Sequence, residues 1–80
     1  MTHKSNYSIM GAKAYNQTDL TLWEAIKVVK GIDWSANDAP NWDTVNITKH
    51  NSRIVAFFCA WSDTVKPAHS ANDDERAAIN

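Results

Sequence analysis

The sequence contains few of the residues on which small proteins depend for covalent or metal stabilisation. Its 80 residues include one cysteine, so no disulfide can form within the chain. The three histidines are scattered and lack the spacing of metal ligands. The two isolated glycines cannot make a glycine-rich phosphate-binding loop. We therefore expect neither a metal ion nor another cofactor.

Long hydrophobic runs and an excess of one charge are also missing. No stretch approaches the roughly 20 apolar residues of a membrane-spanning helix, and the N-terminus leads into no apolar signal segment. These features predict a cytoplasmic protein that does not enter a membrane. The formal net charge is −1, which by itself favours neither nucleic acid nor a membrane surface as a partner.

The length predicts one small domain, residues 1–80, with a thin margin of stability. A chain of this size buries only about two thirds of the surface that its unfolded form exposes. Because a disulfide and a metal are excluded, a tryptophan-rich core and self-association remain as sources of stability. We therefore expect a homo-oligomer. The termini, about residues 1–5 and 67–80, are expected to be loosely ordered.

The clearest predicted element is a helix over residues 21–30. Thr21 and Glu24 have the spacing of a capping box, in which each side chain bonds the backbone N–H of the other residue. Two lysines near the C-terminal end suit the helix dipole, and Gly31 is expected to end the helix in the left-handed conformation. The helix is apolar on one face and should pack against a sheet through Leu22, Ile26 and Val29.

A β-hairpin is predicted after Pro40, which breaks any helix. Residues 44–48 alternate between polar and apolar, as a half-buried strand does. Residues 53–61 form the strongest strand pattern, and they are apolar on both faces after Arg53. This second strand is therefore expected to be central in the sheet or covered on both faces, with strict alternation of its side chains.

The two ends of the chain are less distinctive. Residues 7–15 fit either a strand or a short helix, and we favour a helix capped by Ser5 or Asn6. Residues 70–79 predict a short helix capped by Ser70, with acidic residues in its first turns. The predicted fold class is a small α+β domain, with one principal helix on a short antiparallel sheet built around the hairpin.

The candidate nucleophile is Cys59, with His50 as its base. The thiol lies in the apolar run at residues 56–61, which favours a buried cysteine with a raised pKa over a reactive one.

Asp33, Ser35 and Asn37 resemble the first ligands of a calcium-binding loop. The glycine and the glutamate that such a loop also needs are replaced by Asp38 and Thr44. The aspartates of this segment have no spacing that fixes a shared acid–base site. Solvated or capping roles are favoured for them, and the protein is predicted not to be an enzyme.

Four tryptophans in so short a chain are the most informative feature. Trp23 and Trp61 lie in predicted regular elements and are expected in the core. Trp34 and Trp42 flank a polar, acidic loop and are expected at the surface. Because tryptophan is enriched in interaction hot spots, we predict a partner-binding surface formed by Trp34, Asp38, Trp42, Asp43, Lys49 and Arg53. The alternative is a small single-stranded nucleic-acid or nucleotide-binding module that uses the tryptophans for stacking and the basic residues for phosphates.

The segment Asp33-Trp34 followed by Asp38-Ala39-Pro40-Asn41-Trp42-Asp43-Thr44 resembles small accessory proteins of tailed bacteriophages, in which a tryptophan and Ala-Pro precede a β-hairpin. The resemblance covers about residues 32–61, and the first tryptophan is farther from Ala-Pro than in the usual form. It implies a protein that binds and inhibits a host bacterial protein in the host cytoplasm, for host takeover or against host defence. The pattern defines no catalytic residues.

Overall fold

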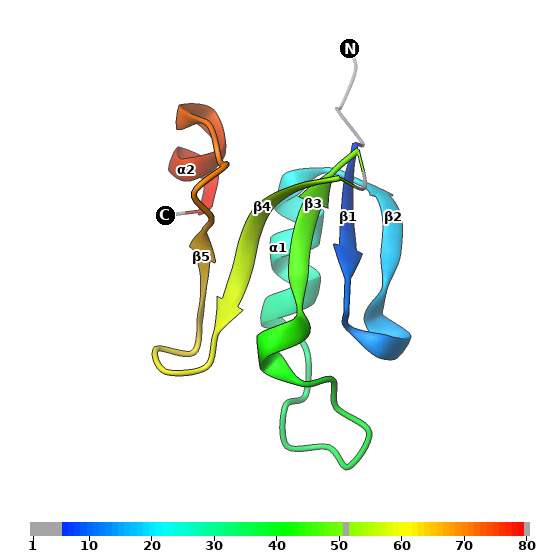
Figure 1. The fold of residues 1–80 in the computed structure, drawn as a ribbon. Helices are drawn as coiled ribbons and strands as arrows, with labels where there is room; N and C mark the ends of the chain where they lie inside the picture. Colours follow the sequence, from blue (N-terminus) through cyan, green and yellow to red (C-terminus); the bar gives the residue numbers. More distant parts are fainter. Residues whose placement is uncertain (1–5, 51, 80) are drawn as a thin grey trace.

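The computed structural model describes residues 6–50 and 52–79. These residues form a five-stranded sheet, two α-helices and two short 3-10 helices (Figure 1). In chain order the elements are β1 (Tyr7–Met10), η1 (Lys13–Tyr15), β2 (Gln17–Leu20), α1 (Leu22–Lys30), η2 (Trp42–Thr44), β3 (Asn46–Lys49), β4 (Arg53–Cys59), β5 (Thr64–Pro67) and α2 (Asp73–Ile79).

The sheet has the order β2-β1-β3-β4-β5, and every neighbouring pair is antiparallel. Helix α1 lies behind the sheet in Figure 1, and α2 lies beside the end of β5. The core forms where α1 meets the inner face of the sheet. This arrangement confirms the predicted small α+β fold. Within the described residues, neither helix has the length and apolar character needed to cross a membrane.

Helix α1 begins as its sequence predicts. The Thr21 N–H donates to Glu24 Oε1 at 2.8 Å, and the Glu24 N–H donates to Thr21 Oγ1 at 3.1 Å, which completes the capping box. Its buried face consists of Leu22, Ala25, Ile26 and Val29. The prediction for Gly31 is wrong, because its φ of −90° is not left-handed and its N–H closes the last turn on Lys27 and Val28.

Strands β3 and β4 form the predicted hairpin, although both are shorter than expected. Ile47 pairs with Ala56 and Thr48 pairs with Ile54, so Val55 lies in a bulge between them. The bulge shifts the alternation of side chains, and Val55 and Ala56 are both buried. Phe57 therefore faces away from the helices and is 40% exposed. Strand β4 is paired with β3 and β5, which confirms the expectation of an interior strand. It is covered on one face only, so the alternative of two covered faces is wrong.

The N-terminal segment is not the predicted helix. Residues 7–10 form the strand β1, which pairs with β2 and β3, and the single helical turn η1 follows. The pairing with β3 gives this segment tertiary stabilisation, whereas an isolated helix of this length is marginal in water. The predicted cap Ser5 lies outside the described residues.

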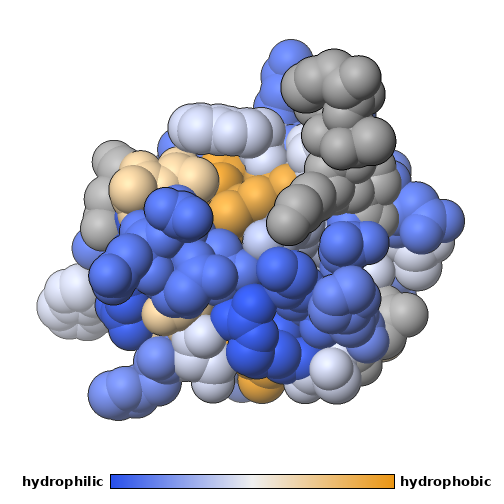
Figure 2. All heavy atoms as spheres, turned by 90° about the horizontal axis from the view of Figure 1, so that it is seen from above, coloured by the Kyte–Doolittle hydropathy of each residue, from blue (hydrophilic) through white to orange (hydrophobic). Residues whose placement is uncertain are grey.

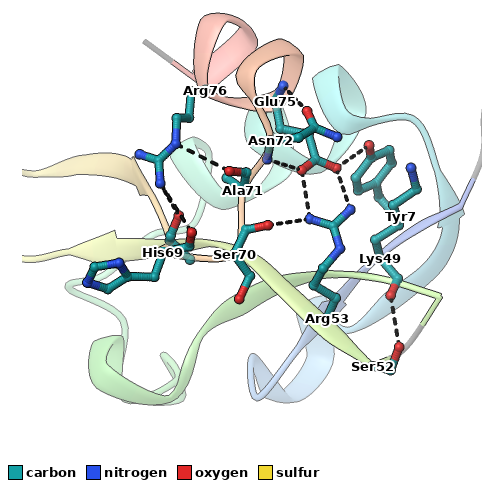
Figure 3. Close-up of polar contacts among 11 residues, drawn as sticks. Tyr7, Lys49, Ser52, Arg53, His69, Ser70, Ala71, Asn72, Glu75 and Arg76 are labelled. Atoms are coloured by element: carbon teal, nitrogen blue, oxygen red, sulfur yellow. Dashed lines mark hydrogen bonds and ion pairs between the residues drawn. The ribbon is translucent and has the colours of Figure 1, made fainter.

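The C-terminal helix exists but begins later than predicted. Asn72, not Ser70, caps α2: the Glu75 N–H donates to Asn72 Oδ1 and the Asn72 N–H donates to Glu75 Oε1, both at 2.8 Å. The Ser70 carbonyl instead accepts a hydrogen bond from Arg53 Nη1 at 2.6 Å. Figure 3 shows how these residues connect α2 to the sheet around the carboxylate of Glu75.

Candidate functional site

The acidic loop between α1 and β3 is held at both ends by buried side chains. Ile32 is 5% exposed where the loop begins, and Val45 is 1% exposed where it ends. Asp33 caps the first turn, since its Oδ1 accepts from the Ser35 N–H at 3.1 Å and from the Ser35 hydroxyl at 2.6 Å. These hydrogen bonds lower the pKa of the Asp33 carboxyl. Asp33 therefore has the capping role that the sequence predicts.

The far end of the loop is joined to β1 through Gly11. The Thr44 hydroxyl donates to the Gly11 carbonyl at 2.7 Å, and Lys13 Nζ donates to the Ala39 carbonyl at 3.3 Å. Gly11 has a φ of +72°, and a Cβ at this position would lie 1.9 Å from the Thr44 carbonyl oxygen. Glycine is therefore required for this close approach. The contact fixes η2, which carries Trp42, against the sheet.

The four tryptophans do not divide as predicted. Trp23 and Trp61 are 68% and 98% exposed, so the expectation that they form the core is wrong. Trp34 is half-buried and packs against the core, with its ring stacked on Phe58 at a centroid distance of 4.2 Å and an interplanar angle of 19°. Trp42 is 52% exposed, as expected of a surface residue. Trp34 is thus held against the core, whereas the Trp42 ring is largely open to solvent.

A pocket of about 260 Å³ lies between these two tryptophans. The loop contributes Trp34, Pro40, Asn41 and Trp42. The end of β4 and the following turn contribute Phe58, Ala60 and Asp63. Small-molecule sites usually measure roughly 300–1,000 Å³, so this pocket has the size expected for a single inserted side chain. It combines aromatic surfaces with one carboxylate, and none of its lining residues is a lysine or arginine.

The structure separates the six predicted site residues. Trp34 and Trp42 line the pocket, while Asp38 and Asp43 are exposed in the same loop outside its lining. Lys49 and Arg53 belong to the turn end of the β3–β4 hairpin, away from the loop (Figure 1).

Both basic residues are also engaged at that end of the hairpin. Lys49 Nζ lies 5.6 Å from the centroid of the Tyr7 ring, and Arg53 is paired with Glu75. The two basic residues and the two tryptophans therefore do not form one surface.

Sequence reasoning missed the contribution of the β4–β5 turn to the pocket. Asp63 adopts a φ of +55° in this turn, a conformation that aspartate tolerates better than most residues. No strand was expected at residues 64–67, so the prediction did not include a chain reversal before them. The residues 61–64, Trp-Ser-Asp-Thr, have turn-forming composition and were the one available signal.

The cysteine prediction also needs correction. Cys59 is partly exposed rather than buried, and a hydrogen bond from the Ser62 side chain lowers the pKa of its thiol instead of raising it. His50 follows β3 at the opposite end of the hairpin, so the two do not form a catalytic pair. In residues 6–50 and 52–79, no group of three or more histidine, cysteine, aspartate or glutamate side chains is arranged to hold a metal ion.

No protein-family model, curated protein or solved structure matches this chain.

Proposed function

We propose that the protein is a non-enzymatic binding module whose pocket between Trp34 and Trp42 receives a lysine or arginine side chain of a partner protein. The observation that carries the proposal is the pairing of indole rings with the Asp63 carboxylate around one small pocket. A cation over a tryptophan face gains about 0.5–2 kcal/mol. A carboxylate beside the ring adds Coulombic attraction to the same cation.

The loop that frames the pocket favours the same kind of partner. Residues 32–48 contain three aspartates and no lysine or arginine. Asp38 and Asp43 are exposed there and can attract a basic surface without entering the pocket. Trp34, held on Phe58, is already ordered before binding, which reduces the entropy that a partner must overcome.

The lining of the pocket supports binding rather than catalysis. Among the described residues, the lining side chains include one titratable group, Asp63, and no serine, threonine or cysteine that could serve as a nucleophile. The resemblance to phage proteins extends the proposal to an inhibitor that covers a basic patch of a host bacterial protein. That extension is supported by the resemblance alone.

The proposal is tested with a short Gly/Ser peptide that carries several arginines, titrated against the protein. A peptide with citrulline in place of arginine is the matched control, because citrulline keeps the shape and lacks the charge. Trp42→Ala and Asp63→Asn should each weaken binding about 3- to 10-fold, consistent with a cation–π contribution near 1 kcal/mol. Trp61→Ala is the control variant, since Trp61 is exposed and lies outside the pocket lining.

Equal binding of the citrulline peptide would contradict the proposal. A single-stranded oligonucleotide that binds more tightly than the arginine peptide, with a steep dependence on salt, would favour the nucleic-acid alternative.

A further inference from the structure

A second hollow surface lies between the two helices. It has a volume of about 540 Å³, and α1 contributes Trp23, Ile26, Lys27 and Lys30 to it. The end of α2 contributes Ala77, Ala78 and Ile79. Ile26 and Ile79 are 6% and 7% exposed and form the apolar floor, whereas Trp23 is 68% exposed at the rim. We call this surface the helix groove.

The solvent side of α1 presents a regular stripe to this groove. Trp23, Lys27 and Lys30 are spaced at i, i+4 and i+7, so they follow one another along the same face. Neither lysine has a carboxylate partner among the residues that the structure describes. The groove therefore has an apolar floor, an exposed indole and two lysines that form no ion pair within residues 6–50 and 52–79.

The surface around the groove is not generally apolar. Figure 2 views the molecule from the end that carries α2, and it shows an apolar area open to solvent among mostly hydrophilic side chains. An exposed tryptophan beside an apolar floor is the composition of an interaction hot spot, because its burial by a partner removes a large apolar area from water.

We propose that the helix groove binds an acidic amphipathic helix of a partner protein. Helices dock into such grooves by placing apolar side chains at i, i+3, i+4 and i+7 on the floor. Carboxylates flanking that apolar stripe would then meet Lys27 and Lys30, which gives the charge complementarity that selects this occupant. The groove is bounded by two helices and offers no strand edge, so a helix fits it better than an extended peptide.

The helix groove and the tryptophan pocket are distinct sites with opposite charge preference. The pocket carries Asp63, whereas the groove carries Lys27 and Lys30, and the two share no lining residue. A failure of one proposal therefore leaves the other untouched, because each is tested with a different probe and different variants.

The test uses a fluorescently labelled helical peptide with leucines at i, i+3, i+4 and i+7 and glutamates on the flanks. Peptides of the same design with glutamine or lysine in place of glutamate measure the charge contribution, and a scrambled peptide measures the contribution of the apolar stripe. We expect the glutamate peptide to bind most tightly. Trp23→Ala should weaken it at least about tenfold, as loss of a hot-spot residue does.

A charge reversal makes the test sharper. The double variant K27E/K30E should lose binding of the glutamate peptide and gain binding of the lysine peptide, whereas Lys66→Glu, at an exposed position in β5 outside the groove, should change neither. Circular dichroism establishes that each variant is folded, and all the changed side chains are exposed.

Four results would overturn the proposal. The first is no binding of the glutamate peptide, and the second is equal binding of the scrambled peptide. The third is binding of lauric acid in the groove without binding of the glutamate peptide, which would assign the groove to a small amphipathic carboxylate. The fourth is a Trp23-dependent dimer in sedimentation, which would assign it to a second copy of this chain.

Discussion

The carboxylate of Glu75 in α2 accepts two hydrogen bonds from Arg53 in β4. Arg53 Nη1 donates to Oε1 at 2.8 Å, and Nη2 donates to Oε2 at 3.0 Å. The same carboxylate accepts the Tyr7 hydroxyl at 2.8 Å, and it is part of a residue that is 2% exposed (Figure 3). Three segments far apart in sequence thus meet at one buried charge. Because α2 forms one side of the helix groove, this network also maintains that surface.

Glu75→Gln should destabilise the protein by about 2–3 kcal/mol. Removing one partner of a buried ion pair leaves the other charge uncompensated, which commonly costs about 3–5 kcal/mol. We expect a smaller loss here than for a fully buried pair, because the Arg53 side chain is 34% exposed and water partly compensates its charge. Urea unfolding measures the change, and Asp74→Asn, on an exposed residue of the same helix, should remain within about 0.5 kcal/mol. Equal effects of the two substitutions would show that the pair contributes little.

Stability should fall in acid through Glu75. The hydrogen bonds from Arg53 are the largest cause that lowers the pKa of Glu75 from its ordinary 4.5 to about 2. The unfolded chain therefore takes up this proton first, so the stabilisation is present above about pH 4.5 and lost as the pH falls towards 2. The difference in urea midpoint between wild type and Glu75→Gln should shrink across this window. A difference that is constant with pH would contradict the assignment.

Tyr7 should produce a matching loss of stability in alkali. Burial, followed by the hydrogen bond to Glu75, raises the pKa of Tyr7 from 10 to about 12. A raised pKa stabilises the fold below pH 10, and this contribution is lost as the pH rises towards 12. A late phase in the phenolate absorbance should be present in the wild type and absent in Tyr7→Phe. If the late phase persists in the variant, another group is responsible.

Gly11→Ala should be far more harmful than Gly31→Ala. A Cβ at residue 11 would collide with the Thr44 backbone at a φ of +72°, so β1 and η2 would have to separate. We expect Gly11→Ala to lower the free energy of unfolding by more than about 2 kcal/mol, because alanine disfavours the positive φ and its Cβ would clash with Thr44. At Gly31 the nearest atom would be the Lys27 carbonyl oxygen at 3.3 Å, and φ is negative. That change should stay within about 1 kcal/mol, and thermal unfolding compares the two.

The two loop tryptophans should differ in what they contribute. Trp34→Ala removes the stack on Phe58 and part of the core packing, so we expect a destabilisation of about 2–3 kcal/mol. Trp42→Ala should cost less than about 1 kcal/mol, because its ring is 52% exposed. Both variants should bind the arginine peptide more weakly. Equal loss of stability in the two would mean that Trp42 is also a core residue.

The parts of the fold that depend on local sequence could be predicted. The capping box of α1 spans four consecutive residues, and the turn of the β3–β4 hairpin is also short. Each pattern can therefore be read from one short stretch of the sequence. The alternation of β4 failed at Val55 because a bulge depends on the pairing with β3, which the strand alone does not encode. The prediction of a helix at residues 7–15 was wrong for the same reason, since β1 is stabilised by its pairing with other strands.

The sequence predicted the tryptophans of the candidate site, Trp34 and Trp42, but not its carboxylate, Asp63. The loop position of Trp34 and Trp42 was visible in the sequence, but whether Trp23 faces the core depends on where its helix meets the sheet. Arg53 was assigned to binding because its partner Glu75 is 22 residues away and no local pattern joins them. Asp63 was missed because the turn that carries it requires β5.

The indole N–H resonances of the four tryptophans test directly whether the pocket between Trp34 and Trp42 receives an arginine side chain. On addition of the arginine peptide, the resonances of Trp34 and Trp42 should shift together with increasing concentration, while those of Trp23 and Trp61 stay in place. The citrulline peptide should leave all four unchanged. Shifts confined to Trp23 or Trp61, or equal shifts with the citrulline peptide, would contradict the account.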